Sequence, residues 1–126
     1  MNNKNNLKFN KRKTGTDYEE LAVNYLEKKK YFIIERNFQV RQAEIDIIAR
    51  DDNTIVFIEV KYRTTRGSGH PLEAVTIQKQ KRICHAALFY MNRNKISPEN
   101  TSIRFDVIGI LGDEITHIEN AFDFIY

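Results

Sequence analysis

Apolar residues recur along the chain with two different spacings. Residues 18–26 carry them at the i, i+3, i+4, i+7 and i+8 positions of a helix packed on one side, which are Tyr18, Leu21, Ala22, Tyr25 and Leu26. This spacing predicts a helix from near Thr16 to near Lys29. A second stripe predicts another helix from Leu72 to about Asn92, with an inner side formed by Leu72, Val75, Thr76, Ile83, Ala86, Ala87 and Tyr90.

Runs rich in Ile, Val and Phe predict five strands, over residues 31–40, 43–49, 54–62, 103–111 and 115–121. The second and third runs are almost continuously apolar, as in strands that are covered on both faces. Asp51, Asp52 and Asn53 form the turn between them, and Gly112 and Asp113 form the turn between the last two. The order helix, three strands, helix, two strands predicts an α/β sandwich around one mixed five-stranded sheet.

The length of 126 residues suits one compact domain. No apolar run approaches the roughly 20 residues that span a bilayer, and residues 1–13 contain no signal-peptide core. Cys84 is the only cysteine, which excludes an internal disulfide and a cysteine zinc site. We therefore expect a cytoplasmic protein without a membrane partner.

Charge is unevenly distributed between the start of the chain and the remainder. Residues 1–13 contain five of the 20 basic residues and no acid, which leaves 15 basic against 17 acidic residues in 14–126. We expect 1–13 to be a basic arm and 14–126 to be a single domain. The arm could steer the protein towards phosphates, or it could be a disordered, solubilising terminus.

Two neighbouring strands carry acids where core residues would be expected. Alternate residues of a strand share a face, so Glu44 and Asp46 lie together, as do Glu59 and Lys61. A two-residue turn would place Asp46 opposite Glu59 and Glu44 opposite Lys61, with Cβ atoms about 4.5–5.5 Å apart. An odd-numbered loop would make these pairs diagonal.

Two carboxylates so close, in strands so apolar, stay ionised more readily beside a divalent cation. Mg²⁺ or Mn²⁺ would be held by Asp46 and Glu59, with Glu44 assisting, because these ions take oxygen ligands. Lys61 could then orient an attacking water or stabilise charge on a phosphate. The alternative is a salt-bridged polar pair at an exposed strand edge.

The helices and one loop add further candidates. Glu19 falls near the apolar sector of the first helix and is a candidate third carboxylate, whereas Glu20 falls on the polar side. Lys79 lies in the inner stripe of the second helix, where it could reach a phosphate or a site carboxylate, or extend past the core edge into water. Asp106 is expected to be structural, on the more polar face of its strand and paired with a basic residue.

Besides Lys79, four exposed basic positions are candidate contacts to a nucleic-acid backbone. Arg63 and Arg66 belong to a glycine-containing loop, and Lys81 and Arg82 lie off the apolar stripe of the second helix, beside Lys79. A solvated surface is the alternative for each of them.

These residues together resemble a known nuclease core. Glu19 on an opening helix, Glu-Ile-Asp at 44–46 and Glu-Val-Lys at 59–61 are similar to the PD-(D/E)xK superfamily. More narrowly, the chain after the arm resembles the YraN-type family of uncharacterised bacterial proteins, through E-E-L-A at 19–22, R-N-F at 36–38, A-E-I-D-I-I-A at 43–49, V-F-I-E-V-K-Y-R at 56–63, K-Q-K-R at 79–82 and R-F-D-V at 104–107.

The resemblance implies a restriction-endonuclease-like α/β/α sandwich and a Mg²⁺- or Mn²⁺-dependent endonuclease acting on DNA, including branched DNA. It implies catalytic roles for Glu19, Asp46, Glu59 and Lys61. A non-catalytic nucleic-acid-binding module that keeps the fold is an alternative, and so is a protein–protein interaction domain. Nucleases that cut symmetric junctions often act as dimers, so a homodimer is also an open alternative.

Overall fold

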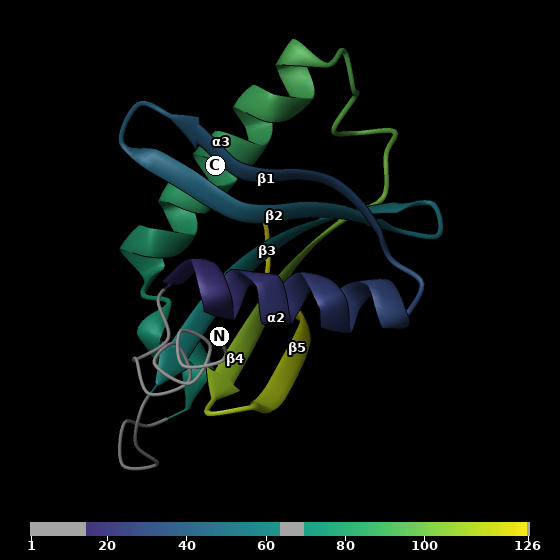
Figure 1. Ribbon diagram of the computed structural model, residues 1–126. Helices are drawn as coiled ribbons and strands as arrows, with labels where there is room; N and C mark the ends of the chain where they lie inside the picture. The colour runs from purple at the N-terminus through teal and green to yellow at the C-terminus, as the bar shows by residue number, and fades with distance from the viewer. Residues whose placement is uncertain (1–14, 64–69, 126) are drawn as a thin grey trace, which may run out of the picture.

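Two helices cover opposite faces of one five-stranded sheet in the computed structural model, which describes residues 15–63 and 70–125 (Figure 1). The helices are α2 (Gly15–Lys28) and α3 (Ile77–Arg93). The strands are β1 (Phe32–Val40), β2 (Ala43–Asp51), β3 (Thr54–Arg63), β4 (Ile103–Leu111) and β5 (Glu114–Phe122). The predicted α/β sandwich and element order are confirmed. The expectations for residues 1–13 and for Arg66 lie outside the described residues.

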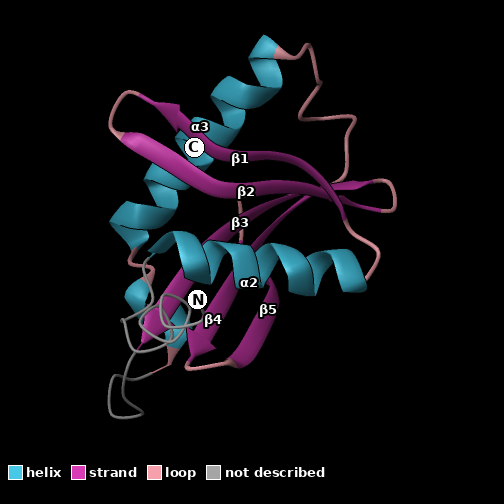
Figure 2. Ribbon diagram, in the orientation of Figure 1, coloured by secondary structure: helices cyan, strands magenta, loops and turns pink. Residues whose placement is uncertain are grey.

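The sheet has the strand order β1-β2-β3-β4-β5, and its pairs are antiparallel except for β3 with β4. A parallel pair needs a crossover connection, and this one runs through α3. In Figure 2, α2 crosses in front of the strands and α3 lies behind them. The sheet is therefore mixed, as predicted, and each face has its own helix.

Each face of the sheet packs into a separate core. Alternation along the strands sends Ile48 and Phe57 towards α3, and Ile47 and Ile58 towards α2. These side chains are almost completely buried. Full burial of one such side chain contributes about 1.5–3 kcal/mol.

The second helix begins later than its apolar stripe predicts. A short 3-10 turn, η2 (Pro71–Ala74), precedes α3, and the helix itself begins at Ile77. Thr76 is its N-cap: its backbone is extended, and its Oγ1 accepts the Lys79 N–H at 3.2 Å. The prediction that the helix starts at Leu72 is therefore wrong, because the stripe continues through a turn of different geometry.

Gly109 allows η2 to pack onto β4. It pairs with Lys61 of β3, and a Cβ at this position would overlap the Pro71 ring. Any side chain here would push the start of the crossover away from the sheet.

A buried polar network joins α2 to β4 and β5. Asp106 is fully buried and bonds to Arg104 at 2.9 Å and to His117 at 2.7 Å, and the opposite nitrogen of His117 meets the Tyr25 hydroxyl at 3.1 Å. Burial alone would raise the pKa of Asp106, but hydrogen bonds with His117, Arg104 and the Asn120 N–H hold it below its usual value. The expected pairing of Asp106 with a basic residue is confirmed. This face of β4 is buried, because α2 covers it.

No helix among the described residues is long and apolar enough to cross a membrane.

Candidate active site

The β2–β3 ladder stops where the predicted acids begin. Its pairs run from Asp51 with Thr54 to Ile47 with Ile58, which is the register expected for a two-residue turn. Asp46 and Glu59 lie one step beyond the last pair. There the Val60 N–H donates to Asp46 Oδ2 at 2.8 Å, so a side-chain oxygen replaces a backbone carbonyl as acceptor. The two strands therefore open at the point where the carboxylates lie.

Asn37 of β1 lies beside this opening. Its φ of 55° is in the left-handed region, which asparagine tolerates better than most residues. On β2, Ile45 packs in the α3 core while Ile47 packs in the α2 core, although strict alternation would put both on one face. The strands thus change faces between these residues, at Asp46. The Asn37 side chain also donates to Glu19 Oε1 at 3.0 Å.

Glu59 is a buried carboxylate with two lysine partners. Its side chain is 5% exposed, and its Oε2 lies 3.3 Å from Lys61 Nζ and 3.6 Å from Lys79 Nζ. A buried charge requires such pairing. Of the roles considered for Lys79, contact with a site carboxylate is the one that the structure shows.

The acids act on one another electrostatically at Asp46. The pKa of Asp46 is raised to about 7, first by burial and then by the negative charge of Glu59, with smaller contributions from Glu44 and Glu19. The hydrogen bond from the Val60 N–H opposes this rise. The pKa of the half-buried Asp46 therefore responds to the other three acids singled out in the sequence.

Glu19 faces the site and Glu20 faces outwards, as the helical phase predicts. The Glu19 side chain is 13% exposed and that of Glu20 is 55% exposed. Arg36 of β1 approaches both, at 3.6 Å and 3.0 Å.

Glu44 lies on the wall of a groove rather than opposite Lys61, because it is beyond the end of the β2–β3 ladder. Its Oε1 accepts a hydrogen bond from Gln39 at 3.2 Å. The groove has a volume of about 350 Å³ and is lined by Gln39, Val40, Gln42, Ala43, Glu44, Lys79, Arg82 and Ile83.

A second hollow of about 430 Å³ adjoins the first and is lined by Arg41, Gln42, Ala43, Gln78, Lys81, Arg82 and His85. The two share three lining residues and lie between the β1–β2 hairpin and the first turns of α3. We refer to them together as the basic groove. It starts at the site, since Lys79 both lines it and contacts Glu59.

Three of the predicted nucleic-acid contacts, Lys79, Lys81 and Arg82, line the basic groove. Arg63 does not: it is half-buried at the end of β3 and donates to the His70 carbonyl oxygen at 3.4 Å. Arg41, at the tip of the β1–β2 hairpin, also lines the basic groove and was not among the predicted contacts. Its position between two predicted strands was the available signal, because hairpin tips project beyond a sheet.

Residues 18–110 match the uncharacterised protein family UPF0102. The chain belongs to this family. UPF0102 proteins of Lachnoclostridium phytofermentans and Aliivibrio fischeri (strain MJ11) are 49% and 48% identical to it, over 91% and 90% of this chain and 97% and 94% of their own lengths. One from Geobacter sulfurreducens is 47% identical over 89% of this chain and 90% of its own length.

The stretch that matches UPF0102 contains every acid of the site. Within the described residues, no three His, Cys, Asp or Glu side chains are arranged as a ready metal cage. Mg²⁺ does not need one, since one or two carboxylates with waters and phosphate oxygens commonly hold it. Asp46 and Glu59 would supply such a pair, and a bound cation would offset the burial and the negative charge of Glu59 that raise the pKa of Asp46. The donor set fits a divalent ion completed by water and substrate.

Proposed function

We propose that this UPF0102 protein is a Mg²⁺- or Mn²⁺-dependent endonuclease that hydrolyses phosphodiester bonds in DNA. The observation that carries the proposal is Asp46, whose pKa is raised to about 7 beside the buried Glu59, where β2 and β3 separate. Perturbed carboxyls in an open site with nearby lysines are typical of catalytic centres. The arrangement also lies near the carboxyl end of β3, where open α/β sheets commonly bind ligands.

The acids and the lysines of the site would have different roles in hydrolysis. Asp46 and Glu59 would hold the metal ion, which when bound supplies Lewis-acid polarisation of the phosphate. Lys61, whose Nζ lies 3.3 Å from Glu59 Oε2, would orient a water for in-line attack and stabilise negative charge on the phosphate oxygens. Lys79 contacts the same Oε2 of Glu59, at 3.6 Å, and joins the site to the basic groove.

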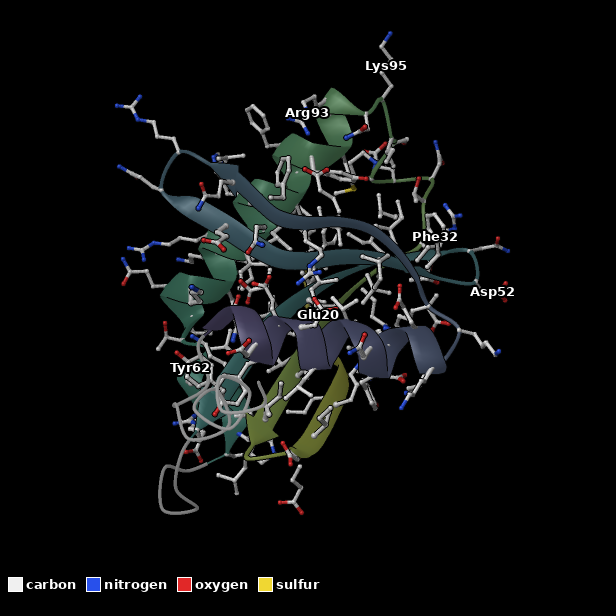
Figure 3. The ribbon with its side chains drawn as sticks, in the orientation of Figure 1. Glu20, Phe32, Asp52, Tyr62, Arg93 and Lys95 are labelled. Carbon is white, nitrogen blue, oxygen red and sulfur yellow. The ribbon has the colours of Figure 1, made fainter. Side chains whose placement is uncertain are left out.

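The test is cleavage of junction, flap, gapped and plasmid DNA in Mn²⁺ or Mg²⁺. Asp46→Asn and Glu59→Gln should each abolish cleavage, because each removes a ligand charge. The matched control is Asp52→Asn in the turn at the opposite end of the same hairpin, where an exposed aspartate has a left-handed φ of 58° that asparagine accepts (Figure 3). Cleavage by Asp46→Asn equal to that of the wild type would refute the proposal.

A non-catalytic nucleic-acid-binding module is the second candidate, and one observation favours it. Lys61 and Lys79 already compensate the charge of Glu59, so the site is partly neutralised without a metal. This candidate predicts DNA binding that survives EDTA and Asp46→Asn, weakens steeply with salt and leads to no cleavage. A strict metal requirement for binding would exclude it.

A further inference from the structure

Two tyrosines form a stacked pair beside the site. The rings of Tyr18 on α2 and Tyr62 on β3 have centroids 4.2 Å apart and planes inclined by 8°. Tyr18 is 7% exposed and Tyr62 is 47% exposed. The buried ring therefore supports the outer one, about half of which is exposed.

Each tyrosine directly adjoins a residue of the proposed active site. Tyr18 precedes Glu19, and Tyr62 follows Lys61. Val60, whose N–H holds Asp46, lies two residues before Tyr62 and therefore on the same face of β3, about 7 Å along the strand. The stacked pair thus joins α2 and β3, two of the three elements that carry the acids, on the α2 side of the sheet.

The α3 side of the site carries charged side chains instead of aromatic rings. Glu59 and Lys61 point to the α3 face, where Lys79 meets them and the basic groove begins. A DNA strand whose phosphates follow the groove would cross the opened end of β2 and β3 and arrive at Tyr62. Phosphate contacts on one side and an aromatic face on the other are how proteins bind single-stranded nucleic acid.

We propose that Tyr62, supported by Tyr18, is a stacking platform for an unpaired nucleobase next to the bond that is cut. Bases inside a duplex already use both faces for stacking, so only an unpaired or splayed base can occupy the platform. The substrate class is therefore DNA with unpaired nucleotides at the cleavage position, such as gaps, flaps and branch points. This inference rests on the proposed function for the position of the scissile bond.

Binding measured in EDTA tests the platform separately from cleavage. The probes are a gapped duplex with 2-aminopurine as its one unpaired base and the same sequence fully paired. Tyr62→Leu, which keeps an apolar side chain on Tyr18 but removes the ring, should weaken binding of the gapped probe roughly 5- to 150-fold, corresponding to about 1–3 kcal/mol. Tyr62→Phe should bind like the wild type, and the paired probe should change by less than twofold.

Phe32→Leu is the matched control, because Phe32 is a 60% exposed aromatic residue near the hairpin end of the sheet, far from Tyr62 (Figure 3). It should leave both affinities unchanged. Equal binding of the gapped probe by Tyr62→Leu and the wild type would overturn the platform, as would equal weakening on both probes.

The fluorescence of 2-aminopurine gives a reading that needs no variant. Wild-type protein should quench the unpaired probe and not the paired one, and failure to quench would also overturn the inference. If quenching occurs but no DNA is cut in Mn²⁺, the platform stands and the endonuclease proposal fails. If cutting depends on Asp46 but no quenching occurs, the endonuclease stands and the platform fails.

Discussion

Replacing Asp46 with asparagine removes one negative charge from the site while keeping an oxygen that can accept the Val60 N–H. In the folded protein the pKa of this carboxyl is about 7, against an ordinary value of 3.8. The folded state therefore keeps a proton through a pH range in which the unfolded chain has lost it. Because the folded state binds this proton more tightly than the unfolded chain, the free energy of unfolding of the wild type falls as pH rises from about 4 to about 7. Above about pH 7 both states have lost the proton, and there is no further loss of stability.

The size of this effect follows from about 1.36 kcal/mol for each pKa unit, which gives at most about 4 kcal/mol at pH 8. Asparagine avoids this penalty but exchanges a charge-assisted hydrogen bond for a neutral one, at a cost of about 1 kcal/mol. We expect Asp46→Asn to be about 1–3 kcal/mol more stable than the wild type at pH 8 in EDTA. At pH 5 most of the penalty is absent, so the difference should shrink by about 2–3 kcal/mol.

Urea unfolding of both proteins at pH 5 and pH 8, with EDTA, measures these differences directly. A parallel series in Mn²⁺ should stabilise the wild type by about 2.7 kcal/mol at 100 times the Kd and leave Asp46→Asn almost unchanged. The control is Asp106→Asn, the same substitution at a carboxyl with a lowered pKa and cationic partners. It should destabilise by about 3–5 kcal/mol, the opposite sign.

The electrostatic reasoning is refuted if Asp46→Asn is less stable than the wild type at pH 8 in EDTA. It is also refuted if the difference between the two proteins is the same at both pH values. Either result would mean that burial and the negative charge of Glu59 do not raise the pKa of Asp46 in the folded state. The Mn²⁺ series then decides separately whether Asp46 is needed to bind an ion.

Three other variants probe the site and the fold around it. Lys61→Ala should lower the rate of Mn²⁺-dependent cleavage by about 10²–10⁴-fold, and an unchanged rate would contradict the catalytic role of Lys61. The increase in melting temperature caused by Mn²⁺ should stay the same, because lysine is not a metal ligand. Lys81→Ala with Arg82→Ala should reduce the slope of log K against log salt by about 0.9 for each lost duplex phosphate contact, and an unaltered slope would place DNA elsewhere. Gly109→Ala should cost about 1–3 kcal/mol in urea unfolding through overlap with Pro71, and unchanged stability would argue against that packing.

Periodicity predicted those parts of the fold that depend on local spacing. Helical phase separates Glu19 from Glu20, and the two-residue turn fixes the register that directs Asp46 and Glu59 towards the same end of the sheet. The contact of Lys79 with Glu59 could not be predicted in this way. Its reach depends on where α3 begins, and that is decided by the Thr76 cap rather than by the apolar stripe.

Features set by tertiary packing could not be read from the sequence. The change of face at Asp46 requires a left-handed Asn37 on a neighbouring strand, and nothing in the local pattern distinguishes that asparagine from one in a turn. Alternation placed Asp106 on the polar side of its strand, but it could not show that α2 covers this side. The contact of Tyr18 with Tyr62 joins residues 44 positions apart, so no spacing rule identifies it.

The buried network around Asp106 holds α2 at Tyr25, away from the residues of the proposed active site. Tyr25 anchors this helix through His117, and six residues earlier the same helix carries Glu19. At a rise of 1.5 Å per residue, a tilt of about 10° around that anchor would displace Glu19 by roughly 1.5 Å. Misplacements of that size can slow an enzyme about a hundredfold. A substitution at His117 that tilts α2 is therefore expected to displace Glu19 and lower activity, although His117 does not contact the site carboxylates.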